Sequence, residues 1–223
     1  MKTRELTLNA MFIAVTVVMA IVPQFGIIQI GLISITVLHI PVIIAGLVLG
    51  YKSAIINALA FGVATLFVAL TRGSGLLDPL FINPLVSVLP RLLFGVSIGL
   101  ISGFMNKVSK NQVLNDATTA ILSTAIHSVL VLGALFIATL GDATIQAAIA
   151  EIMKNPSLGV SGIFAFFLGI LVSNTLFEII VAVLIALPVT NVIKLSPVAV
   201  YSPLAVKKSP RTVSASTVAP FKM

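Results

Sequence analysis

Long apolar runs alternate with short polar or charged connections along the chain, and this pattern predicts an all-α membrane protein. A helix that crosses a bilayer needs about 20 mostly apolar residues, and most of the runs approach that length. We expect six transmembrane helices, at residues 6–22, 39–50, 53–71, from 83 to the turn that carries Lys107, 117–140 and 160–187.

Residues 23–38 break the helical pattern, because β-branched residues alternate there with polar residues and glycine. Such alternation favours an extended segment. At membrane depth an extended backbone must pack on protein or line a cavity, so we expect a lid over the outer mouth of the protein. A longer, tilted second helix is the alternative.

Small residues recur at intervals of four on two of the predicted helices. Ala54, Ala58 and Gly62 form one such stripe, and Ala10 and Ala14 form a shorter one. Small residues at this spacing let another helix backbone approach closely, so both stripes are candidate packing or docking faces.

The composition agrees with a membrane protein, since 59% of the residues are hydrophobic and only 9% are charged. The absence of cysteine excludes disulfides, thiol catalysis and cysteine-ligated metals, and two histidines leave little from which to build a metal site. We therefore expect no cofactor. The net charge of +7 could indicate nucleic acid, but the basic residues lie at the ends of apolar runs without interleaved aromatics, so no nucleic acid is expected as a partner.

The basic residues are distributed unevenly between alternate connections. If both termini are cytoplasmic, the external segments contain only Arg72 and Lys154, as the positive-inside rule requires. Residues 1–195 then form a membrane domain, and residues 196–223 form a basic, Pro/Ser/Thr-rich cytoplasmic tail that we expect to be extended.

Arg91 is the unusual residue of the fourth apolar run. A guanidinium at the bilayer centre costs about 2.5–3.5 kcal/mol on insertion scales, so it normally faces the protein interior and has a partner there. That partner is either a ligand or Glu178, and a side chain that reaches to the membrane surface is a third alternative.

Other polar side chains are expected near Arg91. Helices that run in alternating directions bring His127 and Asn174 to a similar depth, so these groups can converge on one cavity. His39 and Asn83 are expected nearer the outer surface, under the lid. Taken singly, a membrane histidine or asparagine is more often an interhelical hydrogen bond than a ligand contact.

Other functional classes fit the sequence less well. Residues 46–53 resemble a phosphate-binding loop, but the glycine spacing is wrong and no strand precedes it, so any nucleotide energy must come from a partner. A channel should have a polar stripe through the whole depth, whereas the inner halves of the predicted helices are nearly all apolar. An enzyme is not expected, because the Ser, His, Asp and Glu residues have no recognisable catalytic spacing.

Three features together resemble a known family. They are the Ala10/Ala14 pair, residues 36–50 (TVLHIPVIIAGLVLG) and residues 79–91 (PLFINPLVSVLPR). Over residues 6–193 the chain resembles the S components, or substrate-binding subunits, of energy-coupling factor (ECF) vitamin transporters of prokaryotic plasma membranes.

The resemblance implies a six-helix subunit that binds a vitamin near the outer face. It would dock through its alanine motif on a transmembrane coupling subunit, which carries two ABC-type ATPase subunits. The chain looks most like pantothenate-type members, with pyridoxine or hydroxymethylpyrimidine types next. On this basis the expected substrate-binding residues are Arg91 for the carboxylate and, for the other polar groups, Asn83, His127, Asn174, His39 and Ser87.

Overall fold

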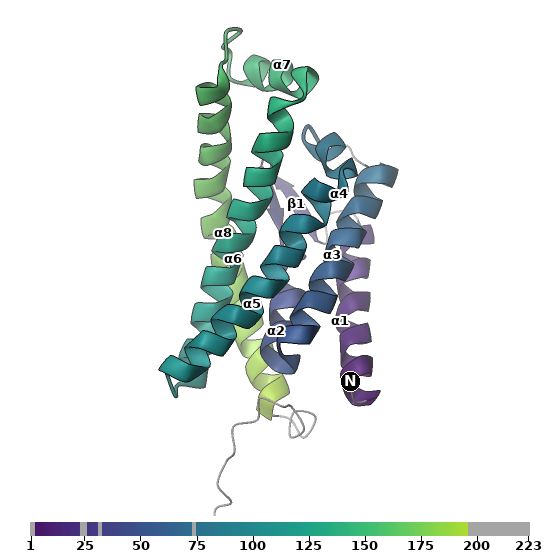
Figure 1. Cartoon of the computed structure of the whole chain (residues 1–223), viewed down its shortest axis with the longest axis vertical. Helices are drawn as coiled ribbons and strands as arrows, with labels where there is room; N and C mark the ends of the chain where they lie inside the picture. The colour runs from purple at the N-terminus through teal and green to yellow at the C-terminus, as the bar shows by residue number, and fades with distance from the viewer. Residues whose placement is uncertain (1–2, 23–25, 31–32, 73–74, 196–223) are drawn as a thin grey trace, which may run out of the picture.

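The computed structural model describes residues 3–22, 26–30, 33–72 and 75–195. This part is mostly helical, and its long helices run side by side while α7 lies at one end (Figure 1). The predicted tail, residues 196–223, lies outside the described residues. The elements are α1 (Thr3–Ile21), β1 (Ile27–Ile30), β2 (Ile33–Thr36), α2 (Ile40–Leu49), α3 (Tyr51–Arg72), the 3-10 helix η1 (Asp78–Ile82), α4 (Pro84–Ser87), α5 (Leu89–Val108), α6 (Gln112–Leu140), α7 (Ala143–Ile152) and α8 (Val160–Leu195).

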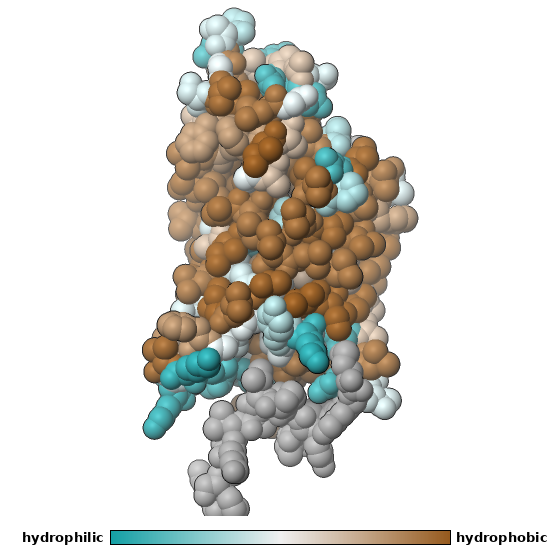
Figure 2. All heavy atoms as spheres, viewed as in Figure 1, coloured by the Kyte–Doolittle hydropathy of each residue, from teal (hydrophilic) through white to brown (hydrophobic). Residues whose placement is uncertain are grey.

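Four stretches are long and apolar enough to cross a membrane, namely α3, α4 with α5, α6 and α8. On the face shown in Figure 2, hydrophobic residues cover the middle and hydrophilic residues gather toward the two ends. Helices α1 and α2 are also apolar but shorter. The ten residues of α2 extend only about 15 Å, half the thickness of a bilayer core. The count of six crossings therefore stays a prediction.

Helix α2 lies at the centre of the fold. Its residues from Ile40 to Val48 are all buried, because the helix is apolar on every side and packs against α1, α3, α5 and α8. It ends at Gly50, whose φ of 93° lies in the region that favours glycine. This turn lets α3 begin at once and pack back against α2.

The segment between α1 and α2 contains an antiparallel hairpin. Strands β1 and β2 pair with Ile27 opposite Thr36, which confirms the predicted extended segment and excludes the alternative of a longer second helix. Strand β2 packs against α8, as expected for extended backbone inside a membrane protein. That the hairpin acts as a lid stays a prediction.

The predicted stripe of small residues on α3 is a close-packing face. Ala54, Ala58 and Gly62 are buried, and α3 packs along α5. A Cβ atom added at Gly95 of α5 would lie 2.5 Å from the Cβ of Ala58 and 2.9 Å from the Ala54 carbonyl oxygen. The two backbones therefore approach as closely as small residues permit.

Two helix ends differ from the sequence prediction. The fourth span is interrupted at Val88, because Pro90 has no N–H for the carbonyl of Val86. The sixth span continues through Pro188 to Leu195 instead of ending at residue 187, since neighbouring helices support a proline inside a membrane helix. Near the end of this continuation the Lys194 ammonium lies 2.7 Å from an Asp116 carboxylate oxygen of α6.

The first helix begins and α8 ends at the same end of the molecule (Figure 1). Lys52, Lys107, Lys110 and Lys194 belong to helix ends or turns on this side. Arg72, at the end of α3, and Lys154, just after α7, belong to the opposite side. This arrangement agrees with the positive-inside rule, and the cytoplasmic location of both termini stays a prediction.

Candidate functional site

Six polar side chains are buried where α2, α5, α6 and α8 meet, and we call this group the polar cluster. It brings together Arg91, His127 and Asn174, whose expected depths suggested such convergence. The polar cluster consists of His39, Arg91, His127, Ser128, Asn174 and Glu178, each 9% exposed or less. Buried polar groups are costly unless they have partners, so the members without a hydrogen bond are the ones available to a ligand.

Arg91 is oriented by the residue that precedes it. In an uninterrupted helix the N–H of residue 90 would donate to the Val86 carbonyl, but Pro90 has no N–H. The Arg91 Nη1 donates to that carbonyl instead, at 2.8 Å. The proline that interrupts the helix thus leaves free the acceptor that fixes the guanidinium.

The Arg91 guanidinium also lies against aromatic rings. Its central carbon is 4.9 Å from the ring centroid of Phe81 and 5.5 Å from that of Phe61. Its Nε has no hydrogen-bond partner within the described chain. No ion pair joins Arg91 to Glu178 there, although the two charges are close enough to interact. Of five N–H donors in the guanidinium, most are therefore available.

The two histidines are stacked on each other beside Arg91. The rings of His39 and His127 are 5.4 Å apart between centroids, with an interplanar angle of 21°. Phe94 lies 4.7 Å and Phe61 5.6 Å from His127. Among the described residues, Nδ1 of His127 and both ring nitrogens of His39 have no well-formed hydrogen bond, although the Thr36 backbone lies near His39. His39 was expected nearer the surface, but the structure places it at the depth of His127.

Glu178 holds the hairpin against the helices. Its Oε1 accepts hydrogen bonds from the Thr36 N–H of β2 at 3.1 Å and from Asn174 Nδ2 at 3.1 Å. Its Oε2 accepts one from the Ser128 hydroxyl at 2.8 Å. Three donors on three different elements therefore stabilise this buried carboxylate without a direct cation.

Asn83 and Ser87 lie outside the polar cluster. Asn83 is exposed, and its Oδ1 accepts from the Leu85 N–H as the cap of α4. Ser87 is buried and donates its hydroxyl to the Asn83 carbonyl at 3.2 Å. Both side chains support the turn whose Val86 carbonyl binds Arg91.

Between its N-terminus and His127, the buried face of α6 is more polar than the sequence pattern indicates. Thr119, Ser123 and Thr124 are fully buried, so the inner halves of the helices are not all apolar. However, Thr119 and Ser123 donate to carbonyls of α6 itself, at 2.7 Å and 2.5 Å. Because their donors are used within the helix, Thr119 and Ser123 do not form a continuous polar path, whereas the Thr124 Oγ1 has no hydrogen-bond partner in the described chain.

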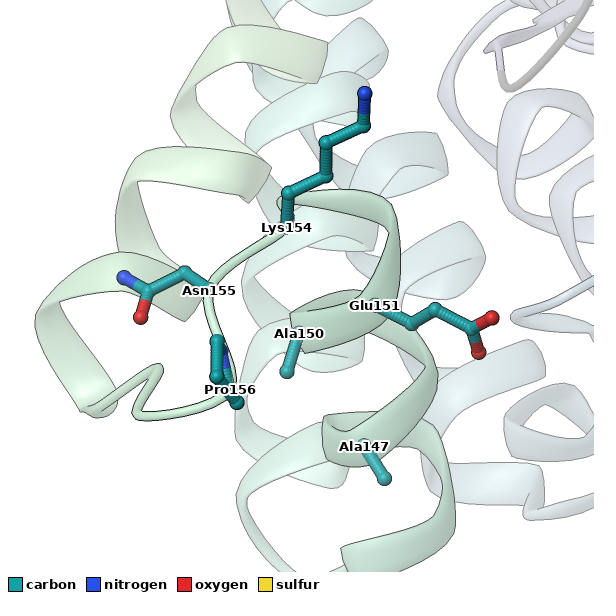
Figure 3. A pocket seen from close by; sticks show the side chains of 6 residues that line it. All are labelled: Ala147, Ala150, Glu151, Lys154, Asn155 and Pro156. Carbon is teal, nitrogen blue, oxygen red and sulfur yellow. The ribbon is translucent and has the colours of Figure 1, made fainter.

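The described chain forms no metal site, and the surface hollow beside α7 does not bring polar groups together. No group of three or more His, Asp or Glu residues there is arranged to hold a metal ion. A surface hollow beside α7 is lined by two alanines, a proline and three polar residues. Glu151 and Lys154 point in different directions there (Figure 3), so they do not converge on one ligand. Its lining residues are Ala147, Ala150, Glu151, Lys154, Asn155 and Pro156.

Ala10 and Ala14 lie on an exposed face of α1. The neighbouring buried face is held to α3 by hydrogen bonds: Asn9 donates to the Ser53 hydroxyl and accepts from Asn57 Nδ2 at 2.7 Å. The alanine pair is therefore not packed against the described part of this chain and is available there for another helix.

Two members of the polar cluster, Glu178 and Ser128, are not among the predicted binding residues. The sequence offers Glu178 only as a partner of Arg91, yet this residue follows Asn174 by four and so shares its helix face. Ser128, and the ring of Phe61 beside the cluster, carry no such signal, since Ser and Phe are common in membrane helices. Their roles depend on which helices become neighbours.

The chain matches the family model described as "ECF transporter, substrate-specific component" over residues 4–190. It is also 25% identical over 201 residues to the protein named pantothenate transporter PanT from Leuconostoc mesenteroides subsp. mesenteroides, in an alignment that covers 86% of this chain and 93% of the relative. The family match includes both the polar cluster and the exposed face of α1.

Proposed function

Because the chain belongs to the family of substrate-specific components of ECF transporters, we propose that it binds a vitamin with high affinity for ATP-driven uptake, and that this vitamin is pantothenate. It is a multi-pass protein of the cell membrane. Its family is a transporter component and not an enzyme, so ATP hydrolysis is assigned to partner subunits. The name of the PanT relative supports the choice of vitamin.

The observation that carries the substrate choice is the buried Arg91 with most of its N–H donors available. Pantothenate has a carboxylate, a central amide and two hydroxyl groups. A guanidinium binds a carboxylate through two parallel hydrogen bonds, and such charge-assisted bonds are about twice as strong as neutral ones. His39, His127 and Asn174 are the neighbouring candidates for the amide and hydroxyl groups.

A second candidate substrate is favoured by the aromatic surroundings of His127. The stacked His39 ring and the rings of Phe61 and Phe94 could pack against a planar heterocycle. Pyridoxine and hydroxymethylpyrimidine have such a ring but no carboxylate. They would leave the Arg91 guanidinium without its anion, so we place them second.

Titration calorimetry on the purified full chain tests the substrate choice. We expect heat on addition of pantothenate and none on addition of pyridoxine. Heat with pyridoxine alone would leave the family unchanged and refute the choice of vitamin. Native mass spectrometry of gently purified protein, which detects a retained small molecule, is an independent readout.

For the partners, we propose that α1 docks on a transmembrane coupling subunit through Ala10 and Ala14, and that this subunit carries two ABC-type ATPase subunits. Ala10→Trp or Ala14→Trp should abolish uptake by the assembled transporter and spare vitamin binding, because the indole blocks helix approach far from the polar cluster. Val15→Trp is the matched control, since Val15 is also exposed but lies about 100° around the helix from Ala14. Loss of binding in the alanine variants would contradict docking.

A further inference from the structure

The hydrogen bonds that the described residues make to Glu178 leave one acceptor position of its carboxylate unused. A carboxylate has about four acceptor sites. Three of them are occupied among the described residues, by the Thr36 N–H, the Asn174 amide and the Ser128 hydroxyl. Within the described part of the chain Oε2 receives only the Ser128 hydroxyl, so the fourth site belongs to this oxygen.

Asn174 adds a second available acceptor at the same place. Its Nδ2 donates to Glu178, which fixes the orientation of the amide. Its Oδ1 is buried and has no partner in the described part of the chain. Around Glu178 the polar cluster therefore offers acceptors, whereas around Arg91 it offers donors.

Helix α6 connects these two ends, since it packs against both α5 and α8. His127 contacts the Phe61 ring, over which the Arg91 guanidinium lies. The next residue, Ser128, donates to Glu178. Successive helix residues point about 100° apart, so His127 faces the donors around Arg91 while Ser128 faces the acceptors around Glu178.

We propose that Glu178 is a second anchor of the binding site, where its carboxylate and the Asn174 Oδ1 accept hydrogen bonds from the hydroxyl groups of a ligand whose own carboxylate is bound by Arg91. The substrate class is a small organic acid with hydrogen-bond donors at the end remote from its carboxylate. This inference rests on the proposed function and deepens it.

The opposite charges of Arg91 and Glu178 also set the orientation of the bound ligand. A ligand carboxylate next to Glu178 would face a like charge in a dry site, whereas next to Arg91 it meets an opposite one. The arrangement therefore selects one orientation and disfavours dicarboxylates. Pantothenate fits, because its hydroxyl groups lie at the end opposite to its carboxylate.

The competing explanation is that Glu178 only holds β2 in place through Thr36. The two explanations differ in their dependence on the ligand hydroxyl groups. We would titrate the purified full chain with pantothenate and with an analogue in which both hydroxyl groups are replaced by hydrogen. The wild-type chain should bind the analogue at least about tenfold more weakly.

The Glu178→Gln variant then distinguishes a direct ligand contact from support of β2. Glutamine can keep the Thr36 and Asn174 bonds through its oxygen, but its amide replaces the free acceptor by a donor. We expect this variant to bind pantothenate about tenfold more weakly than wild type, and to bind the dehydroxylated analogue with wild-type affinity. Glu151→Gln, the same substitution at an exposed position on α7, should change neither affinity.

Three results would overturn the inference, and they are distinguishable. If the wild-type chain binds the analogue as tightly as pantothenate, no anchor for the hydroxyl groups exists, whether or not the variant folds. If Glu178→Gln weakens both ligands equally, the residue acts only through the hairpin. If the wild-type chain binds no pantothenate, the proposed substrate itself is wrong.

Discussion

Replacement of Arg91 by lysine removes the bidentate fork of the guanidinium but keeps a positive charge. In the structure, Nη1 is occupied by the Val86 carbonyl at 2.8 Å, and the plane of the group is held near Phe81 and Phe61. The other N–H groups can therefore address a carboxylate as a pair. A lysine ammonium would have to divide its three donors between Val86 and the ligand.

The expected loss can be worked from these contacts. A hydrogen bond to a charged group contributes about 1.5–3 kcal/mol, so loss of one of the two ligand bonds corresponds to about a ten- to hundredfold increase in Kd for pantothenate. The matching change on the ligand is pantothenol, in which an alcohol replaces the carboxylate. Because pantothenol never makes the charged pair, its affinity should fall much less in the Arg91→Lys variant.

Calorimetric titration of both ligands into both proteins measures this coupling. Arg72→Lys is the matched control, since Arg72 lies at the far end of α3 and donates to the Ile21 carbonyl. An equal loss for pantothenate and pantothenol would refute a direct contact between Arg91 and the carboxylate. An unchanged Kd for pantothenate would refute the role of the fork.

Two further predictions concern the fold. The chain contains no cysteine, so single introduced cysteines report the topology. Ser109→Cys, in the turn between α5 and α6, should react with an impermeant thiol reagent only from the cytoplasmic side, and Ser157→Cys, between α7 and α8, only from outside. A reversed pattern would contradict the proposed orientation. Gly95→Ala should lower the free energy of unfolding by about 1–3 kcal/mol, because its Cβ would overlap Ala58. Gly103→Ala is the control in the same denaturation assay: its Cβ would meet no described atom within 4 Å, so the free energy of unfolding should not fall and should rise by up to about 1 kcal/mol.

The sequence predicts the long elements of this fold because their signals are local. A run of apolar residues specifies a membrane helix, and the spacing of Ala54, Ala58 and Gly62 specifies a close-packed face, which the structure confirms. The alternation in residues 23–38 likewise predicts extended backbone, which the structure shows as a hairpin. Each of these inferences depends on neighbours within a few residues.

The less predictable features depend on which elements meet. The depth of His39 is set by its stacking on His127, which lies on a helix far along the chain. The partners of Glu178 come from β2, α6 and α8, so the alternative of an Arg91–Glu178 pair could not be settled without the tertiary structure. For the same reason, the continuation of α8 past Pro188 depends on support from its neighbours.

Four of the predicted binding residues lie in the polar cluster, whereas Asn83 and Ser87 lie in the turn before it. Pro90 connects the two sets, because it leaves the carbonyl of this turn free for Arg91. Arg91 lies in the polar cluster with His127, but its direction is set by the Val86 carbonyl, which is free because the next turn contains a proline. The cap formed by Asn83 holds that turn in place. Asn83 therefore acts on Arg91 through the backbone of α4 and not through the cluster. A sequence motif around a buried arginine can thus combine a residue that is available to a ligand with residues that only orient it.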